Sequence, residues 1–389
     1  MFLKKFSLPF QLIAIIAFVF LCGDFFNESS VRFFYTFSLL FKSVLSLFLP
    51  LIIFSFVLTG ILSFKRNAPL VLAVLVASIF VSNSVIALLT YLVGVAVVPF
   101  VVQGISIDGF QIASGVEPYY QFDFPTLITS ENALLIAIVI GIALSFVRIP
   151  KLERGIRIFK DAVENFLNYY FIPLLPLYVF GFLLEIHYRG IFASLFSHYG
   201  KAFIVILSVQ VVFLLAYYFL AASGSTKKMI KYIQNALPSY LTAFSTMSST
   251  TTIPVSVECA EKNMNNKPLA EISMPIMANI HLVGDSISTP LLAMVTVSLF
   301  LGTFPDPISY IKFVFFFCTA MLAVSGIPGG GIIVMIPILI SQLGFNEQMV
   351  SIITALYLLL DPFGTAANVM GDGALVIIVN KVLKKLRVV

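Results

Sequence analysis

Four polar residues near the C-terminus, Asp361, Thr365, Asn368 and Asp372, have the types and the spacing of a ligand site. They lie in an apolar stretch, 350–379, with the length and composition of a membrane span. At about 100° per residue, these positions fall on one face of a helix. Ionisable side chains within a membrane usually mark a functional site, and a hydrogen-bonding seam between helices is the alternative. Two aspartates fit a seam poorly, so we predict a site for a substrate or an ion.

The composition is that of a polytopic membrane protein. Of the 389 residues, 60% are hydrophobic and 11% are charged, whereas soluble domains carry about 25% charged residues. The net charge of +5 does not indicate nucleic-acid binding, because the basic residues cluster at the ends of apolar segments. Cys22, Cys259 and Cys318 have no metal-binding spacing, and we expect them to pack in the interior.

Hydropathy predicts six spans in the first part of the chain, and the longer ones should tilt or kink, for example at Pro50. Basic residues precede the first span and follow the second, fourth and sixth, whereas the other loops contain few. This distribution predicts that both termini are cytoplasmic. The predicted spans are 9–21, 33–63, 69–102, 132–147, 152–186 and 202–222.

The second part of the chain has apolar segments with polar interruptions. Seven of the eight residues 245–252 are hydroxylated, which favours turns and helix caps over a lipid-facing helix and predicts a re-entrant hairpin. The apolar segment 307–343 is broken by the glycine-rich stretch 325–331, and a span at 271–301 is interrupted at 279–286. Interrupted segments of this kind are the best sequence indication of a transporter's binding site.

Four segments in chain order carry a resemblance to a known family: Leu49–Ser55 with Thr59–Ile61, Ala243–Thr250 with Glu258–Asn263, Gly326–Gly330, and Asp361–Asp372. They resemble the dicarboxylate/amino acid:cation symporter family, DAACS, which includes the glutamate transporters. The resemblance implies an all-α polytopic membrane protein with eight transmembrane helices plus two re-entrant helical hairpins. It also implies an elevator-type transporter fold and a homotrimer.

The resemblance implies two functional parts. Residues 1–228 would hold six spans, mostly a scaffold for trimerisation, with spans three and six joining the transport domain. Residues 229–389 would form the transport core from hairpin one, broken span seven, hairpin two and span eight. We expect an integral protein of a bacterial cytoplasmic (inner) membrane, with the lipid bilayer as its surroundings and no nucleic-acid partner.

Carried over residue by residue, the resemblance assigns roles to the polar stripe. Asp361 would bind the substrate amino group with help from Thr365. Asn368 would bind the α-carboxylate, and Asp372 would be a sodium ligand. The tip of the first hairpin, with Ser248 and Ser249, would contact the substrate carboxylate. The tip of the second hairpin, with Gly326, Pro328 and Gly329, would close as the extracellular gate.

One departure from the family bears on the substrate. Members that transport acidic substrates have an arginine three residues after the aspartate of the last helix, where this chain has Gly364. Loss of this bidentate donor should weaken selection for a side-chain carboxylate. The sequence therefore predicts a neutral amino acid, and a basic side chain is conceivable because Asp285 aligns with a threonine near the substrate side chain.

A second departure bears on the coupling ion. The family motif Asn-Met-Asp-Gly-Thr aligns with His281 to Asp285, so that Val283 replaces a sodium-binding aspartate. A shift of one residue would instead let Asp285 replace that carboxylate. Fewer sodium ions, or proton coupling through His281 and Asp285, follow from this change; a buried imidazole bonded to a backbone carbonyl is the alternative for His281. The candidate cation-site residues are Asp372, Asn368, Asn279 and His281.

We therefore predict a secondary active symporter that imports a small amino acid, driven by Na⁺ or H⁺, with no organic cofactor. The alternative substrate is a dicarboxylate such as succinate or an acidic amino acid such as glutamate or aspartate. A channel is a further class, but no feature indicates a dedicated open pore. A hydrolase would need Ser248 or Ser249 within hydrogen-bond reach of His281 in a water-accessible site, and we predict that the protein is not an enzyme.

Overall fold

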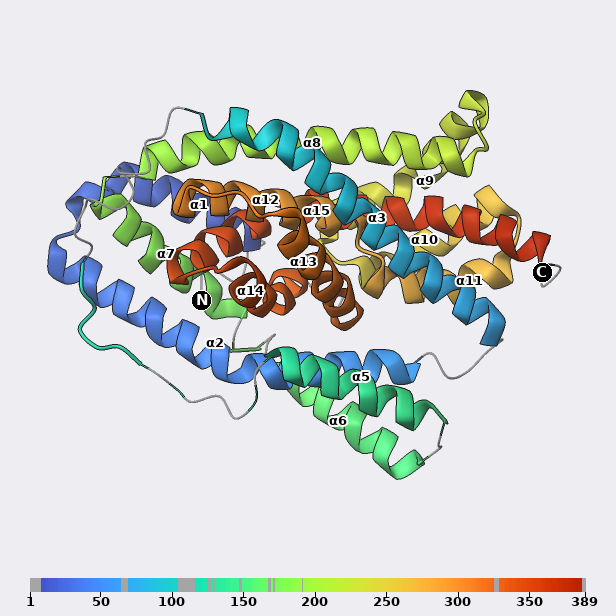
Figure 1. The fold of residues 1–389 in the computed structure, drawn as a ribbon, viewed down its shortest axis with the longest axis horizontal. Coiled ribbons are helices and arrows are strands. Elements are labelled where there is room, and N and C mark those ends of the chain that lie inside the picture. Colours follow the sequence, from blue (N-terminus) through green and yellow to red (C-terminus); the bar gives the residue numbers. More distant parts are fainter. Residues whose placement is uncertain are drawn as a thin grey trace.

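A computed structural model describes residues 8–386 except 64–68, 104–115, 123, 125–127, 129, 147–148, 167–168, 171, 191 and 325–328. The described residues form helices, turns and irregular segments, without a strand among them (Figure 1). The elements are α1 (Leu8–Cys22), η2 (Gly23–Phe25), α2 (Glu28–Ser63), α3 (Pro69–Val101), α5 (Ser130–Phe146), α6 (Pro150–Phe166), α7 (Ile172–Tyr188), α8 (Phe192–Ala221), α9 (Thr226–Thr246), α10 (Ser249–Met264), α11 (Lys267–Ile280), α12 (Val283–Leu301), α13 (Pro307–Ala320), η4 (Met321–Ala323), α14 (Gly330–Leu343) and α15 (Glu347–Lys385).

The N-terminal helices form one packing group. The long helix α2 packs against α5, α6 and α7, and α1 packs against α7. Edge-to-face aromatic pairs join α7 to α2 and to the connection before α2, with the Phe34 and Phe180 rings 4.9 Å apart and the Phe26 and Phe180 rings 5.8 Å apart. In Figure 1, α2, α5 and α6 lie along the lower side and α8 along the upper side, with α12 to α15 between them.

The C-terminal elements form the buried centre of the molecule. Helix α15 packs against α8, α9, α10, α11 and α12, and α12 also packs against α3 and α8. The third and sixth predicted spans, α3 and α8, thus lie directly against the broken span. This packing explains why α12 and most of α15 are buried although both are apolar enough to face lipid.

The broken span is interrupted over only two residues. Helix α11 ends at Ile280, His281 and Leu282 are non-helical, and α12 begins at Val283. Asn83 of α3 fills the gap, donating from Nδ2 to the Ile280 carbonyl (2.8 Å) and accepting from the Leu282 N–H (3.2 Å). A side chain from a neighbouring helix therefore satisfies two of the backbone groups that the break releases.

The segment predicted as the first re-entrant hairpin forms the helix pair α9 and α10 with a tight turn, and its re-entry into the membrane remains a prediction. Met247 takes the left-handed conformation (φ 51°), and Ser248 caps α10 by accepting from the Thr251 N–H (3.2 Å). The hydroxylated stretch is thus largely helical, because one serine cap suffices to start the new helix. The second hairpin is formed by α13, η4 and α14, while Gly326 and Pro328 lie outside the described residues.

Some predicted spans differ from the observed helices. The predicted span 152–186 is divided into the charged helix α6 and the apolar helix α7, whereas α2 continues through Pro50 without ending. Among the described residues, four segments are long and apolar enough to cross a membrane: Ala73–Val101, Ser197–Ala221, Lys267–Leu301 and Glu347–Lys385. The number of spans and the elevator arrangement remain predictions.

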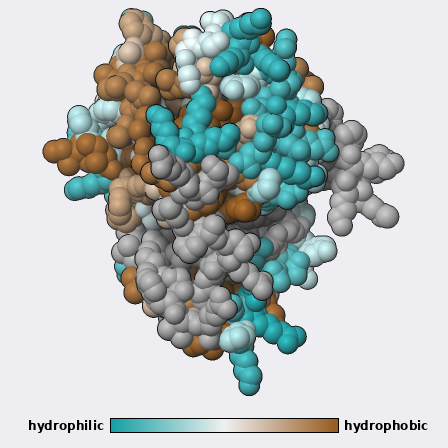
Figure 2. All heavy atoms as spheres, turned by 90° about the vertical axis from the view of Figure 1, so that its right-hand side faces the viewer, coloured by the Kyte–Doolittle hydropathy of each residue, from teal (hydrophilic) through white to brown (hydrophobic). Residues whose placement is uncertain are grey.

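One end of the molecule carries a group of exposed polar side chains. Lys381, near the end of α15, donates to Ser223 Oγ (2.7 Å) and to the Ala221 carbonyl, so the C-terminal end of α15 meets the connection between α8 and α9. Figure 2 shows hydrophilic residues gathered on this end. Its chemistry is that of the predicted cytoplasmic side. The exposed lysines near these helix ends and the connection from α10 to α11 are Lys227, Lys228, Lys231, Lys262, Lys267, Lys384 and Lys385.

Candidate functional site

The polar stripe predicted from the sequence is a buried face of α15. Asp361, Thr365, Asn368 and Asp372 are all helical and are at most 7% exposed. The Thr365 hydroxyl donates to Asp361 Oδ1 (3.1 Å), as expected for residues one turn apart. The stripe divides between two neighbouring clusters, one around Asp361 and Asn368 and one around Asp372.

Asp361 joins α15 to the second hairpin. The Gly329 N–H donates to Asp361 Oδ2 (3.0 Å) at the start of α14. Gly329 has a φ of +72°, which other residues rarely adopt, so glycine permits this approach. The hairpin expected to close the site therefore contacts the carboxylate expected to bind the substrate.

Asn368 joins α15 to the start of α12. Its Oδ1 accepts from the Gly284 N–H (2.7 Å) and from the Asp285 N–H (3.4 Å), and its Nδ2 donates to Asp285 Oδ2 (3.0 Å). The Tyr357 hydroxyl donates to Asp285 Oδ1 (2.7 Å). Both oxygens of this buried carboxylate are thus held by neutral donors.

These residues line a small pocket of about 20 Å³. Ser249, from the first turn of α10, lines it, whereas Ser248 is used as the cap of that helix. The start of α10 directs backbone N–H groups and the positive end of its dipole towards this region. None of the described lining residues is basic: Met247, Ser249, Ala278, Leu282, Asp285, Val324, Gly331, Tyr357, Asp361, Thr365 and Asn368.

Asp372 belongs to a separate chain of hydrogen bonds. His281 Nδ1 lies 2.8 Å from Asp372 Oδ1, and His281 Nε2 lies 2.9 Å from Ser82 Oγ, which is 2.9 Å from the Tyr217 hydroxyl. His281 is 0% exposed and Asp372 is 1% exposed. The alternative of an imidazole bonded to a backbone carbonyl is therefore wrong, because both ring nitrogens have side-chain partners.

The structure also distinguishes the two alignments of the broken span. The Val283 side chain packs against Gly371, beside Asp372, where a Cβ on Gly371 would come within 2.3 Å of Val283 Cγ2. Asp285 instead contacts Asn368 in the pocket. The shifted alignment, in which Asp285 replaces the lost carboxylate, does not fit this arrangement. The Asn279 amide donates to the Pro275 carbonyl of its own helix (3.0 Å).

Several residues of these clusters were not predicted. Tyr357 lies one turn before Asp361 and extends the stripe, so helical spacing could have found it. The polar triplet at 82–84 interrupts the apolar helix α3, and this interruption was a second available signal. Tyr217 carried no comparable signal, because a tyrosine in an apolar helix is ordinary.

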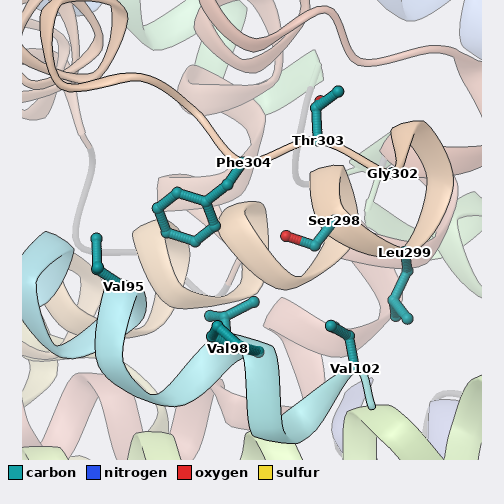
Figure 3. Close-up of a pocket in the computed structure, with 9 residues that line it drawn as sticks. Val95, Val98, Val102, Ser298, Leu299, Gly302, Thr303 and Phe304 are labelled. Carbon is teal, nitrogen blue, oxygen red and sulfur yellow. The ribbon is translucent and has the colours of Figure 1, made fainter. Parts of the chain in front are cut away.

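A larger cavity lies away from these groups, between the ends of α3 and α12. It has a volume of about 510 Å³, and its lining is mostly apolar (Figure 3). Phe304, Val95 and Val98 face it, and Ser298 and Thr303 are its only hydroxylated lining residues among those described. Without a charged group, this cavity lacks the means to bind an amino acid.

Comparison with known proteins bears on this geometry. The model of the sodium:dicarboxylate symporter family matches residues 8–382. The chain belongs to this family. It is 28% identical to excitatory amino acid transporter 3 of Homo sapiens over 207 residues, which are 53% of this chain and 38% of that protein. It is 27% identical to excitatory amino acid transporter 1 of Rattus norvegicus over 195 residues, which are 49% of this chain and 35% of that protein.

A third relative, excitatory amino acid transporter 3 of Oryctolagus cuniculus, is 30% identical over 164 residues, 41% of this chain and 30% of that protein. The matched segments thus span about a third of the length of these relatives. Membership confirms the resemblance found in the sequence. The apolar helices agree with an integral membrane protein.

Proposed function

We propose that this member of the sodium:dicarboxylate symporter family imports a small amino acid without an acidic side chain, driven by a cation gradient. The observation that carries the proposal is the small pocket between Asp361, Asn368 and Ser249, with no basic residue among the described lining residues. A carboxylate for an ammonium group, together with an amide and a helix N-terminus for a carboxylate, is complementary to an amino acid head group.

Gly364 supports the exclusion of acidic side chains. Selection of a second carboxylate needs a charged donor in the pocket, and a buried carboxylate without one is expensive. The absence of a basic residue among the described lining residues therefore favours an amino acid without a second carboxylate. A dicarboxylate or acidic amino acid is the second candidate, favoured by the description of the family and by the excitatory amino acid transporters among its relatives.

The coupling ion is Na⁺ or H⁺ in this proposal. The family description supports sodium. A sodium ion bound at Asp372 would compete with His281 for the carboxylate oxygen, because His281 Nδ1 lies 2.8 Å from Asp372 Oδ1. The enzyme alternative is weakened by the same contact, since the imidazole nitrogens engage Asp372 and Ser82 instead of either serine of the first hairpin.

We extend the proposal to the whole assembly. The packing of α3 and α8 on α12 supports a transport domain that combines these helices with residues 229–389, moving against a scaffold from the remaining N-terminal spans. A homotrimer in a bacterial inner membrane, with both termini cytoplasmic and two re-entrant hairpins, completes this proposal.

Uptake into proteoliposomes tests the proposed function. Radiolabelled alanine, serine, glutamate, aspartate, lysine and succinate are each supplied under an inward sodium gradient and, separately, an inward proton gradient. We expect gradient-dependent uptake of non-acidic amino acids and none in protein-free liposomes. Preferential uptake of glutamate or succinate would overturn the substrate assignment. No uptake of any compound by folded protein would overturn the transport function.

A further inference from the structure

The Asp285 carboxylate lies beside Gly364, where a larger residue would place its side chain. A Cβ built on Gly364 would lie 3.6 Å from Asp285 Oδ1, with no other group outside its own helix as near. A Cβ built on Gly284 would come within 2.3 Å of the Gly364 carbonyl oxygen, so the backbones of α12 and α15 touch at this point. Asp285 therefore projects from α12 into the space that a side chain of residue 364 would enter.

Asp285 has bonding capacity left in this position. Tyr357 and Asn368 each donate one hydrogen bond to it, whereas an ionised carboxylate offers about four acceptor sites. Both donors are neutral, so they orient the carboxylate without balancing its charge. Asp285 is 6% exposed and lines the same pocket as Asp361. The pocket thus brings together two buried carboxylates with no cationic residue among its described lining.

The charges of this pocket differ from those needed by a neutral amino acid. A single α-ammonium group compensates Asp361 and leaves Asp285 unmatched in a buried site, which is unfavourable. A second ammonium group, on a short side chain, would compensate Asp285. An amino acid with two ammonium groups and one carboxylate would match two carboxylates, one amide and one helix N-terminus.

We infer that Asp285 selects the substrate side chain and that the preferred substrate is a small diamino monocarboxylic acid. The inference rests on the proposed function, because it assigns the side-chain end of the same pocket. A short side chain keeps its ammonium group beside Asp285, which lines the same small pocket as Asp361. The Asp285 carboxylate accepts the side-chain ammonium, Asp361 the α-ammonium, and Tyr357 holds Asp285 in position.

A matched pair of substrates tests the inference. L-2,4-diaminobutyrate and L-homoserine have the same carbon skeleton and differ by an ammonium group in place of a hydroxyl. Uptake of each into proteoliposomes is measured for the native protein, for Asp285→Asn and for Asp285→Thr. The control is Asp161→Asn, which makes the same chemical change at an exposed position of α6. Thermal unfolding of each purified variant establishes that it is folded.

We expect the native protein to prefer diaminobutyrate and each Asp285 variant to lose this preference by about 30-fold or more, since truncation of a buried charge pair has effects of this size. Homoserine uptake should persist or rise in the variants, and Asp161→Asn should match the native protein.

Three results would overturn the inference. The first is a preference of the native protein for homoserine, and the second is an unchanged preference for diaminobutyrate in folded Asp285 variants. The third is that the Asp285 variants lose their dependence on the cation gradient but keep the substrate preference, which would make Asp285 a ligand of the coupling ion. In each of these cases transport of an amino acid persists and the proposed function stands. If no compound is taken up, the proposed function fails together with the inference.

Discussion

We expect the Gly284→Ala variant to be less stable and to transport poorly, because the added methyl group enters a backbone contact. Its Cβ would lie 2.3 Å from the Gly364 carbonyl oxygen and 2.7 Å from Gly364 Cα, distances that real Cβ atoms essentially never show. Both neighbouring atoms are backbone, so no side chain can rotate away. The two helices must move apart at the pocket.

The magnitude follows from two effects of this movement. Overpacking in a well-packed interior costs about 1–3 kcal/mol. The separation also stretches the 2.7 Å hydrogen bond from the Gly284 N–H to Asn368 Oδ1, and a buried polar group left unsatisfied costs about 1–3 kcal/mol. We therefore expect a loss of about 2–6 kcal/mol in the free energy of unfolding, together with a displaced Asn368 and reduced uptake.

The assay is denaturant unfolding of the purified protein in detergent, combined with proteoliposome uptake. Gly155→Ala is the matched control, because a Cβ at this helical position meets nothing within 4 Å. Alanine in an exposed helix should raise the stability by about 0.5–1 kcal/mol. Equal stability of the two variants, with normal uptake by Gly284→Ala, would refute the close approach of α12 and α15.

Three further changes separate the parts of the site. Asn83→Ala removes both hydrogen bonds across the break in span seven, and we expect a loss of about 1–3 kcal/mol in unfolding free energy, whereas a change under 0.5 kcal/mol would contradict this role. His281→Gln disturbs the contact between His281 and the buried Asp372 carboxylate, whereas Ser82→Ala removes only a neutral partner of His281. The His281→Gln variant should therefore unfold at a lower temperature than Ser82→Ala. Similar unfolding temperatures would argue against a buried His281–Asp372 ion pair. Asp361→Asn keeps the shape of the side chain but loses its charge, so uptake of every amino acid should fall by at least about tenfold with the fold retained, and normal uptake would exclude ammonium binding there.

The sequence by itself determined the features that depend on local order along the chain. A helix repeats its side-chain directions every few residues, so the spacing of Asp361, Thr365, Asn368 and Asp372 placed them on one face before any packing was known. Similarly, hydroxylated residues and glycines within apolar segments located the breaks at 247–248 and near 329. The family membership was accessible for the same reason, because its motifs are short and contiguous.

Only the tertiary structure decided which groups meet across helices. The partners of Asp285 and Asp372, namely Tyr357 and His281, are 72 and 91 residues away in the sequence. The phase of one helix does not reveal which residue of another helix lies opposite it. The alignment of span seven therefore stayed open until packing placed Val283 against Gly371 and directed Asp285 into the pocket. The charge at the side-chain end of the site is a consequence of that packing, because it depends on how α12 meets α15.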